Sequence, residues 1–100
     1  MSLVFEWDPR KAQANLLKHN VSFAEATSVF SGPLARIFDD EYHSADELRE
    51  IIVGHSREGR LLLICFTEIE DGRVRIISAR CATKKELHDY EENVKHYRQS

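Results

Sequence analysis

Arg60, Arg80, His19 and His55 are of the residue types that cleavage of a phosphodiester bond requires. Attack by a ribose 2′-hydroxyl needs a base for the hydroxyl proton, an acid for the leaving 5′-oxygen and cations for the charge on phosphorus. Arginine holds a phosphate through two parallel hydrogen bonds, and histidine exchanges protons near neutral pH. The two arginines are therefore candidate phosphate ligands, and the two histidines are candidate proton carriers.

Arg80 ends an apolar stretch and directly precedes the start of a predicted helix. Thr83 and Glu86 have the spacing of a capping box, from which a polar helix would run towards Tyr97. Helix N-termini favour anions because their first N–H groups lack partners within the helix. We predict that Arg80 binds phosphate there, with an ion pair to an acid elsewhere in the chain as the alternative.

The pair Asp71-Gly72 is the strongest hairpin signal in the chain and predicts a strand register. Opposite charges that face each other across two strands stabilise by about 0.2–1 kcal/mol. Such pairs would explain Arg73 and Arg75 without a ligand, and the alternative for Arg75 is a contact with RNA. A two-residue loop places Glu70 opposite Arg73, Glu68 opposite Arg75 and Leu63 opposite Arg80.

His55 reaches the same face as Arg80 only if the preceding hairpin has a three-residue loop. Residues 57–59 would form that loop, with Gly59 in the left-handed conformation. A two-residue loop would turn His55 to the other face, and the two side chains could not act together. The three-residue loop places Ser56 opposite Arg60, His55 opposite Leu61 and Val53 opposite Leu63.

Lys18 and His19 end another predicted helix, where the helix dipole alone would explain two cations. The alternative is a second acid–base pair or a phosphate contact. Trp7, the only tryptophan, is either a core residue beside a helix start or a surface on which a base stacks. Together with Arg75, the residues Trp7 and Lys84 are the predicted RNA contacts.

The charge distribution favours one basic face, although the net charge of −3 argues against a nonspecific nucleic-acid coat. Residues 73–85 carry five cations and no acid, whereas acids collect over 39–50 and 86–92. The alternative is a solvated surface with scattered charges.

The two cysteines, Cys65 and Cys81, are too few and too far apart for a disulfide framework or a zinc site and are expected to be reduced thiols. His43, Asp46 and Glu47 form only a weak metal-ligand set. We therefore expect neither a metal nor a cofactor.

Eight elements would position these residues in one domain over residues 1–100. Their order, β-α-α-β-β-β-β-α, predicts an α+β fold with a mostly antiparallel sheet. In the first helix, Ala12 and Leu16 form the predicted inner stripe, and Asn20 suits a left-handed cap. No apolar run spans a bilayer and no signal peptide is recognisable, so a cytoplasmic protein without membrane contact is expected. The predicted strands cover 5–7, 34–39, 48–55, 61–66 and 73–79, and the helices 9–19, 22–30 and 83–97.

A set of short stretches covers almost the whole chain in one order: residues 5–9, 11–12, 15, 18–23, 25–26, 29–30, 43–44, 59–62, 75–80 and 82–86. This ordered set resembles the BrnT family of ribonuclease toxins. The family has glycine more often where this chain has Asn20, and asparagine also tolerates the left-handed conformation.

The resemblance implies a fold similar to the RelE-type toxins and RNA cleavage that arrests translation. It also implies a hetero-oligomer with an antitoxin of the BrnA kind, which folds against the toxin and contacts operon DNA through its own DNA-binding part. Lys18, His19, Arg60 and Arg80 stand at matching motif positions, which implies that they form one active surface.

The sequence thus predicts a metal-independent endoribonuclease. The alternative is a non-catalytic RNA-binding or protein-interaction module on the same scaffold. A DNA-binding regulator is disfavoured because the chain is acidic and lacks a recognisable DNA-reading helix.

Overall fold

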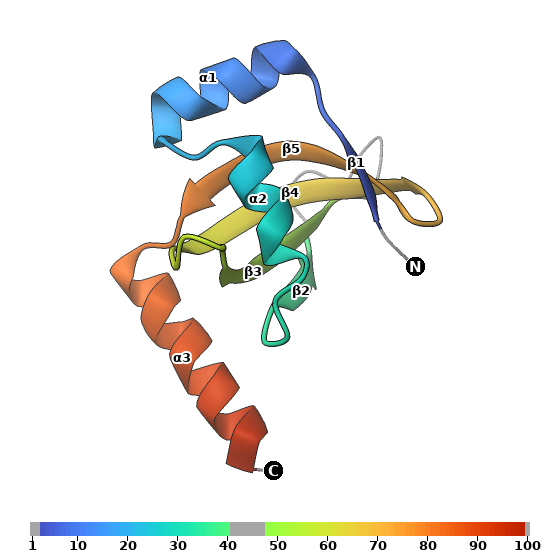
Figure 1. The fold of residues 1–100 in the computed structure, drawn as a ribbon. Helices are drawn as coiled ribbons and strands as arrows, with labels where there is room; N and C mark the ends of the chain where they lie inside the picture. Colours follow the sequence, from blue (N-terminus) through green and yellow to red (C-terminus); the bar gives the residue numbers. More distant parts are fainter. Residues whose placement is uncertain (1–2, 41–47, 100) are drawn as a thin grey trace.

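The computed structural model describes residues 3–40 and 48–99 and confirms the predicted α+β fold and element order (Figure 1). Helices α1 and α2 lie against one face of a twisted sheet, whereas α3 leaves the end of β5 and points away from it. None of the described helices is long and apolar enough to cross a membrane. The elements are β1 (Val4–Glu6), α1 (Pro9–His19), α2 (Phe23–Val29), β2 (Arg36–Asp39), β3 (Glu50–His55), β4 (Leu61–Glu70), β5 (Arg73–Cys81) and α3 (Lys84–Gln99).

The helix ends follow their local sequence. Asp8 accepts a hydrogen bond from the Arg10 amide, and Pro9 occupies the first helical position of α1. Asn20 ends α1 with φ +56°, the predicted left-handed cap. Ser22 caps α2 by accepting from the Glu25 amide at 3.0 Å. These caps fix where each helix begins and ends.

The sheet has the strand order β1-β5-β4-β3-β2, with β1 parallel to β5 and the other pairs antiparallel. The β4–β5 hairpin confirms two of the three predicted pairings, Glu70 with Arg73 and Leu63 with Arg80. The third was wrong, because the register shifts by one residue and then returns, so that Arg75 lies opposite Thr67 rather than Glu68. Such irregularities turn side chains to faces that simple alternation does not predict.

The β3–β4 hairpin has the predicted three-residue loop. Gly59 is left-handed with φ +83°, and the Ser56 amide donates to the Arg60 carbonyl at 2.8 Å. His55 therefore lies opposite Leu61, as predicted.

The two faces of the sheet carry different cores. Ile52, Leu62 and Ile64 point to the face that α1 and α2 cover, which we call the α1–α2 face. The alternate residues Val53 and Leu61 point to the other side, where they pack against Tyr90 of α3; this is the α3 face. The apolar run of β4 is thus covered on both sides, as predicted for a central strand.

Candidate active site

Arg80 lies near the end of β5 on the α3 face. Its guanidinium forms a two-pronged pair with Glu86 of α3, at 2.8 Å from Nη1 to Oε1 and 2.9 Å from Nη2 to Oε2. Nη1 also donates to the Cys81 carbonyl at 3.3 Å. The alternative prediction for Arg80, an ion pair with an acid elsewhere in the chain, is therefore confirmed.

Glu86 has two tasks at this position. Its carboxylate accepts from the Thr83 amide at 2.8 Å while its own amide donates to the Thr83 hydroxyl, which is the predicted capping box. The Arg80 hydrogen bonds, opposed by partial burial and supported by Thr83, lower the pKa of Glu86 to about 2. The pair therefore remains ionised at neutral pH and holds the start of α3 to β5.

Arg80 lines a pocket of about 370 Å³ on the α3 face, which we call the Arg80 pocket. A second arginine, Arg49, lies in the same pocket with the carboxyl of Asp40. The Cys65 thiol donates to that carboxyl across 3.6 Å. With two arginines and one aspartate among its lining residues, the pocket has an excess of positive charge that can bind an anion. The described lining residues are Asp40, Arg49, Ile51, Leu63, Cys65, Ile77, Ser78 and Arg80.

His55 shares the α3 face with Arg80 but is not among the described residues that line the Arg80 pocket. Its ring packs edge-on against Tyr90, with centroids 5.7 Å apart. Two strand spacings separate β3 from β5, roughly 10 Å. The two side chains do not contact each other. Both can nevertheless contact one extended substrate that lies across this face.

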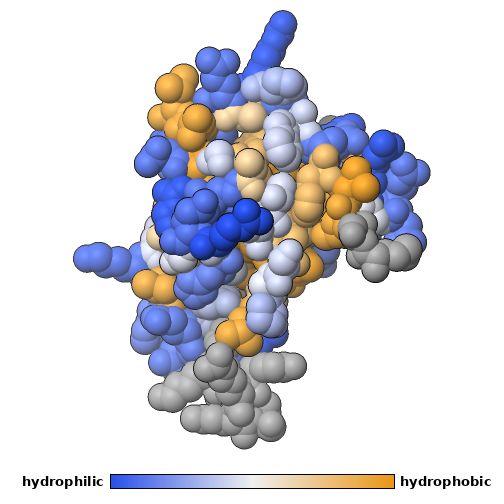
Figure 2. Space-filling view, viewed as in Figure 1, coloured by the Kyte–Doolittle hydropathy of each residue, from blue (hydrophilic) through white to orange (hydrophobic). Residues whose placement is uncertain are grey.

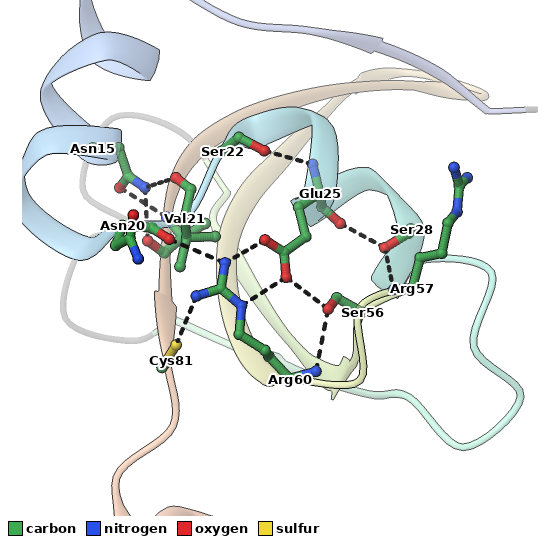
Figure 3. Close-up of polar contacts among 11 residues, drawn as sticks. Asn15, Asn20, Val21, Ser22, Glu25, Ser28, Ser56, Arg57, Arg60 and Cys81 are labelled. Atoms are coloured by element: carbon green, nitrogen blue, oxygen red, sulfur yellow. Dashed lines mark hydrogen bonds and ion pairs between the residues drawn. The ribbon is translucent and has the colours of Figure 1, made fainter.

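Arg60 belongs to a different network, the Arg60 clamp, formed by Arg60, Glu25, Ser56 and the Asn20 carbonyl (Figure 3). Arg60 pairs with Glu25 through two hydrogen bonds, one of them from Nε at 2.9 Å. Nη2 also donates to the Asn20 carbonyl at 3.0 Å, and the Ser56 hydroxyl donates to Glu25 at 2.7 Å. The clamp joins the end of α1, the start of α2 and the β3–β4 hairpin.

Burial of the clamp is uneven. The Glu25 side chain is only 8% exposed, whereas Arg60 is 35% exposed. The Arg60 hydrogen bonds lower the pKa of Glu25 against the opposing effect of burial, and the Ser56 hydroxyl adds to the lowering. The same pairing raises the pKa of Arg60. The carboxylate is therefore a buried anion whose compensation comes mainly from one guanidinium.

One active surface of Lys18, His19, Arg60 and Arg80 stays a prediction, and the structure turns the side chains of Arg60 and Arg80 to different faces of the sheet. Arg60 directly precedes Leu61, whose side chain faces α3, and alternation along the strand turns Arg60 to the opposite side, against α2. Arg80 contacts α3 instead. The two guanidinium groups thus point to opposite faces of the sheet, although both contact Cys81 at the end of β5, Arg60 at the thiol and Arg80 at the carbonyl.

Lys18 and His19 lie on the Arg60 side. They occupy the last turn of α1, and the carbonyl of the next residue, Asn20, accepts from Arg60. Lys18 is exposed and His19 half-buried. Lys18 and His19 are thus close along the chain to a carbonyl that Arg60 contacts, whereas His55 and Arg80 lie on the other face.

Two of the three predicted RNA contacts meet at the β1–β5 edge. Trp7 packs edge-on against Phe23, with ring centroids 5.9 Å apart, and also lines a pocket with Arg75. The predicted ion pair of Arg75 exists, but its partner is Glu6 of β1 at 3.2 Å. Lys84 is exposed at the start of α3, away from this edge.

Sequence reasoning missed Asn15, which is buried where Leu16 was expected; Leu16 is 47% exposed. The Asn15 amide accepts from the Ala79 N–H at 3.0 Å and donates to the Ala79 carbonyl at 2.8 Å and the Val21 carbonyl at 2.9 Å. The strand β1 pairs only with residues 73–75 of β5. Further along β5, the Asn15 amide pairs with the Ala79 backbone as a neighbouring strand would. No local sequence signal marks this role, because the neighbours of Asn15 one turn away include Lys11, Lys18 and His19.

Metal ligands can be assessed only in part. Among residues 3–40 and 48–99, no three His, Cys, Asp or Glu side chains are grouped to hold a metal ion. The weak set His43, Asp46 and Glu47 lies outside the described residues.

With this geometry in place, the chain was compared with known proteins. The family model described as "Ribonuclease toxin, BrnT, of type II toxin-antitoxin system" matches residues 7–86. The chain belongs to the BrnT family. A solved structure of the Brucella abortus ribonuclease toxin BrnT is similar, with a TM-score of 0.63 and 26% identity, over 84% of this chain and 99% of that one. No curated protein sequence is significantly similar.

Both arginine networks lie within the segment that the family model matches. Residues 7–86 include Glu25 and Arg60 of the clamp as well as Arg80 and Glu86. The match ends at Glu86, so most of α3 lies beyond it. The matched segment therefore contains α1, α2, strands β2 to β5 and the capped start of α3, whereas β1 precedes it.

Proposed function

We propose that this chain is a metal-independent endoribonuclease that inhibits translation, with the Arg80 pocket as its active site. The substrate is single-stranded or ribosome-presented RNA. Membership of the BrnT family supports the ribonuclease activity, and the two guanidinium groups of the pocket support this location. Arginines in the pocket supply the positive charge that a phosphorane needs.

The reaction proceeds by intramolecular attack. The ribose 2′-oxygen forms a bond to phosphorus, and the bond from phosphorus to the 5′-oxygen breaks, which leaves a 2′,3′-cyclic phosphate and a 5′-hydroxyl. His55 accepts the 2′-hydroxyl proton, and a second proton donor or water protonates the 5′-oxygen. Arg80 and Arg49 stabilise the negative charge that develops on the phosphate oxygens.

The free donors of Arg80 are the observation that carries this proposal. A guanidinium has five N–H donors in fixed positions. Glu86 and the Cys81 carbonyl take three of those of Arg80. Among the described residues nothing accepts from the remaining Nε–H and Nη2–H, which share one edge of the planar group. That edge matches two phosphate oxygens.

Cleavage of single-stranded RNA by the purified protein in EDTA tests the proposal. We expect cleavage to persist, with Arg80→Gln reducing kcat/KM by about 100-fold or more. The matched control is Arg57→Gln, because the Arg57 side chain is exposed and points away from the clamp (Figure 3). Strict dependence on added Mg²⁺, or equal activity of the two variants, would refute the proposal.

A non-catalytic binding module is the second candidate, because both Arg60 and Arg80 already hold carboxylates. Expression without antitoxin separates the two. A wild type that halts growth beside a harmless but folded Arg80→Gln variant supports catalysis, and equal harmlessness supports the binding module.

We further propose that a BrnA-like antitoxin neutralises the toxin as a hetero-oligomer and contacts operon DNA, in a complex that forms in the cytoplasm. The family's description as one half of a toxin–antitoxin system supports this partner.

A further inference from the structure

A second pocket lies at the edge of the sheet beside the Arg80 pocket. It has a volume of about 310 Å³ and is lined by Glu6, Trp7, Asp8, Lys11, Arg75, Ile76 and Ile77. We call it the Trp7 pocket. Ile77 lines both pockets, so they are neighbours along β5. The space exists because β1 pairs only with residues 73–75 of β5 and the chain then turns into α1.

The chemistry of the Trp7 pocket differs from that of the Arg80 pocket. It combines an aromatic ring with two cations and two carboxylates, so that it offers both donors and acceptors on its wall. Its two carboxylates balance its two cations, so the wall carries no net positive charge to favour a phosphate. A nucleobase suits this mixture, because bases stack on aromatic rings and present donors and acceptors on their edges.

Two charged groups at this site are available to a ligand. One carboxylate oxygen of Asp8 accepts the Arg10 amide, and the other has no partner among the residues that the structure describes. The Lys11 side chain, one turn into α1, is exposed and likewise without a partner in the described part of the chain. Arg75 and Glu6 occupy each other.

We infer that the Trp7 pocket binds a guanine base of the RNA substrate, an inference that rests on the proposed ribonuclease function. Guanine carries two neighbouring donors, N1–H and the N2 amino group, which a carboxylate can accept, and two acceptors, O6 and N7, which a cation can reach. Asp8 accepts the donors, Lys11 donates to O6 and N7, and Trp7 contacts the ring. Adenine and cytosine do not combine two neighbouring donors with two neighbouring acceptors in this way.

The test measures binding of guanosine, adenosine and cytidine 5′-monophosphates by calorimetry, with tryptophan fluorescence as the locator. Trp7 is the only tryptophan, so its emission reports on this pocket alone. We expect guanosine monophosphate to bind at least about tenfold more tightly than the other two and to change the emission.

Asp8→Asn is the decisive variant, because asparagine is as good an N-cap as aspartate but removes the negatively charged acceptor. We expect it to fold normally and to lose the preference for guanosine monophosphate. The matched control is Asp71→Asn, which keeps a hairpin turn at an exposed site and should retain the preference. Equal affinity for the three nucleotides, an unchanged emission, or a preference that survives in Asp8→Asn would overturn the inference.

Failure of this inference differs from failure of the proposed function. A chain that cleaves RNA without favouring guanosine has the activity but not the base pocket. A chain that binds guanosine monophosphate at Trp7 but never cleaves RNA keeps the pocket and loses the activity.

Discussion

The two arginine–glutamate pairs of this fold have similar geometry and different surroundings. Arg60 and Glu25 are 35% and 8% exposed, and Arg80 and Glu86 are 41% and 32% exposed. Arg60 uses four of its five donors on Glu25, the Asn20 carbonyl and the Cys81 thiol, whereas Arg80 uses three. Both pairs join elements of the fold, but the second leaves one edge of its guanidinium for a ligand.

The comparison teaches that an ion pair does not decide whether an arginine is functional. A buried carboxylate must be compensated, so Arg60 cannot leave Glu25 without a large cost. Glu86 can be hydrated more readily, and its capping role holds it in place when Arg80 engages a ligand. We therefore propose a structural role for Arg60 and a catalytic one for Arg80.

Figure 2 shows the molecule in the view of Figure 1, in which α2 lies in front of the sheet. Hydrophilic residues gather left of the centre of this view, and apolar areas lie right of the centre and at the upper left. The upper left area lies over α1, whose Leu16 and Leu17 are 47% and 83% exposed.

The largest change in stability is expected for Asn15→Leu, next to the clamp. The substitution leaves the N–H and carbonyl of Ala79 and the Val21 carbonyl without their side-chain partner. Buried groups left without partners cost about 1–3 kcal/mol each, and partial rehydration should bring the total to about 3 kcal/mol. Urea unfolding measures it. A loss below about 1 kcal/mol would show that the clamp side does not depend on this amide.

The two glutamates provide the direct comparison of the pairs. Glu25→Gln should destabilise by about 2 kcal/mol, because a neutral amide opposes Arg60 in a mostly buried site. Glu86→Gln should cost less than about 1 kcal/mol, because glutamine can keep the capping box and the pair is half-exposed. Thermal unfolding of both variants gives the order. The reverse order would contradict the assignment of roles.

The smallest expected effect is the dependence on pH of the contribution that Glu86 makes to stability. The pKa of Glu86 is about 2 in the folded protein, below its ordinary 4.5, so its pairing contributes fully above pH 4.5 and is lost as the pH falls towards 2. The stability difference between wild type and Glu86→Gln should therefore shrink over that interval. Denaturant unfolding at several pH values measures it. A difference that stays constant from pH 5 to pH 2 would show that the Arg80 pair does not contribute through its charge.

Local signals predicted most of the fold. Asp71-Gly72, Gly59, Asn20 and the caps at Asp8 and Ser22 fix turns and helix ends from neighbouring residues. The register irregularities of β4 and β5 were not predicted, because they cancel over the length of the hairpin and leave both ends in register.

The candidate site could be predicted less completely. The partner of Arg80 lies six residues away in a capping box, so its position was within reach of local reasoning. Glu25 and Arg60 are 35 residues apart, and only the folded sheet shows that they meet. Arg49 and Asp40 enter the Arg80 pocket for the same reason, since they flank the β2–β3 connection and meet β5 through tertiary structure.

The most direct test of the central claim is RNA cleavage by Arg60→Gln and Arg80→Gln, measured well below their unfolding temperatures and expressed per folded molecule. The account predicts that Arg60→Gln unfolds at a lower temperature yet cleaves at close to the wild-type rate, whereas Arg80→Gln loses about 100-fold or more in kcat/KM with a smaller change in stability. A folded Arg60→Gln protein as inactive as Arg80→Gln would contradict it.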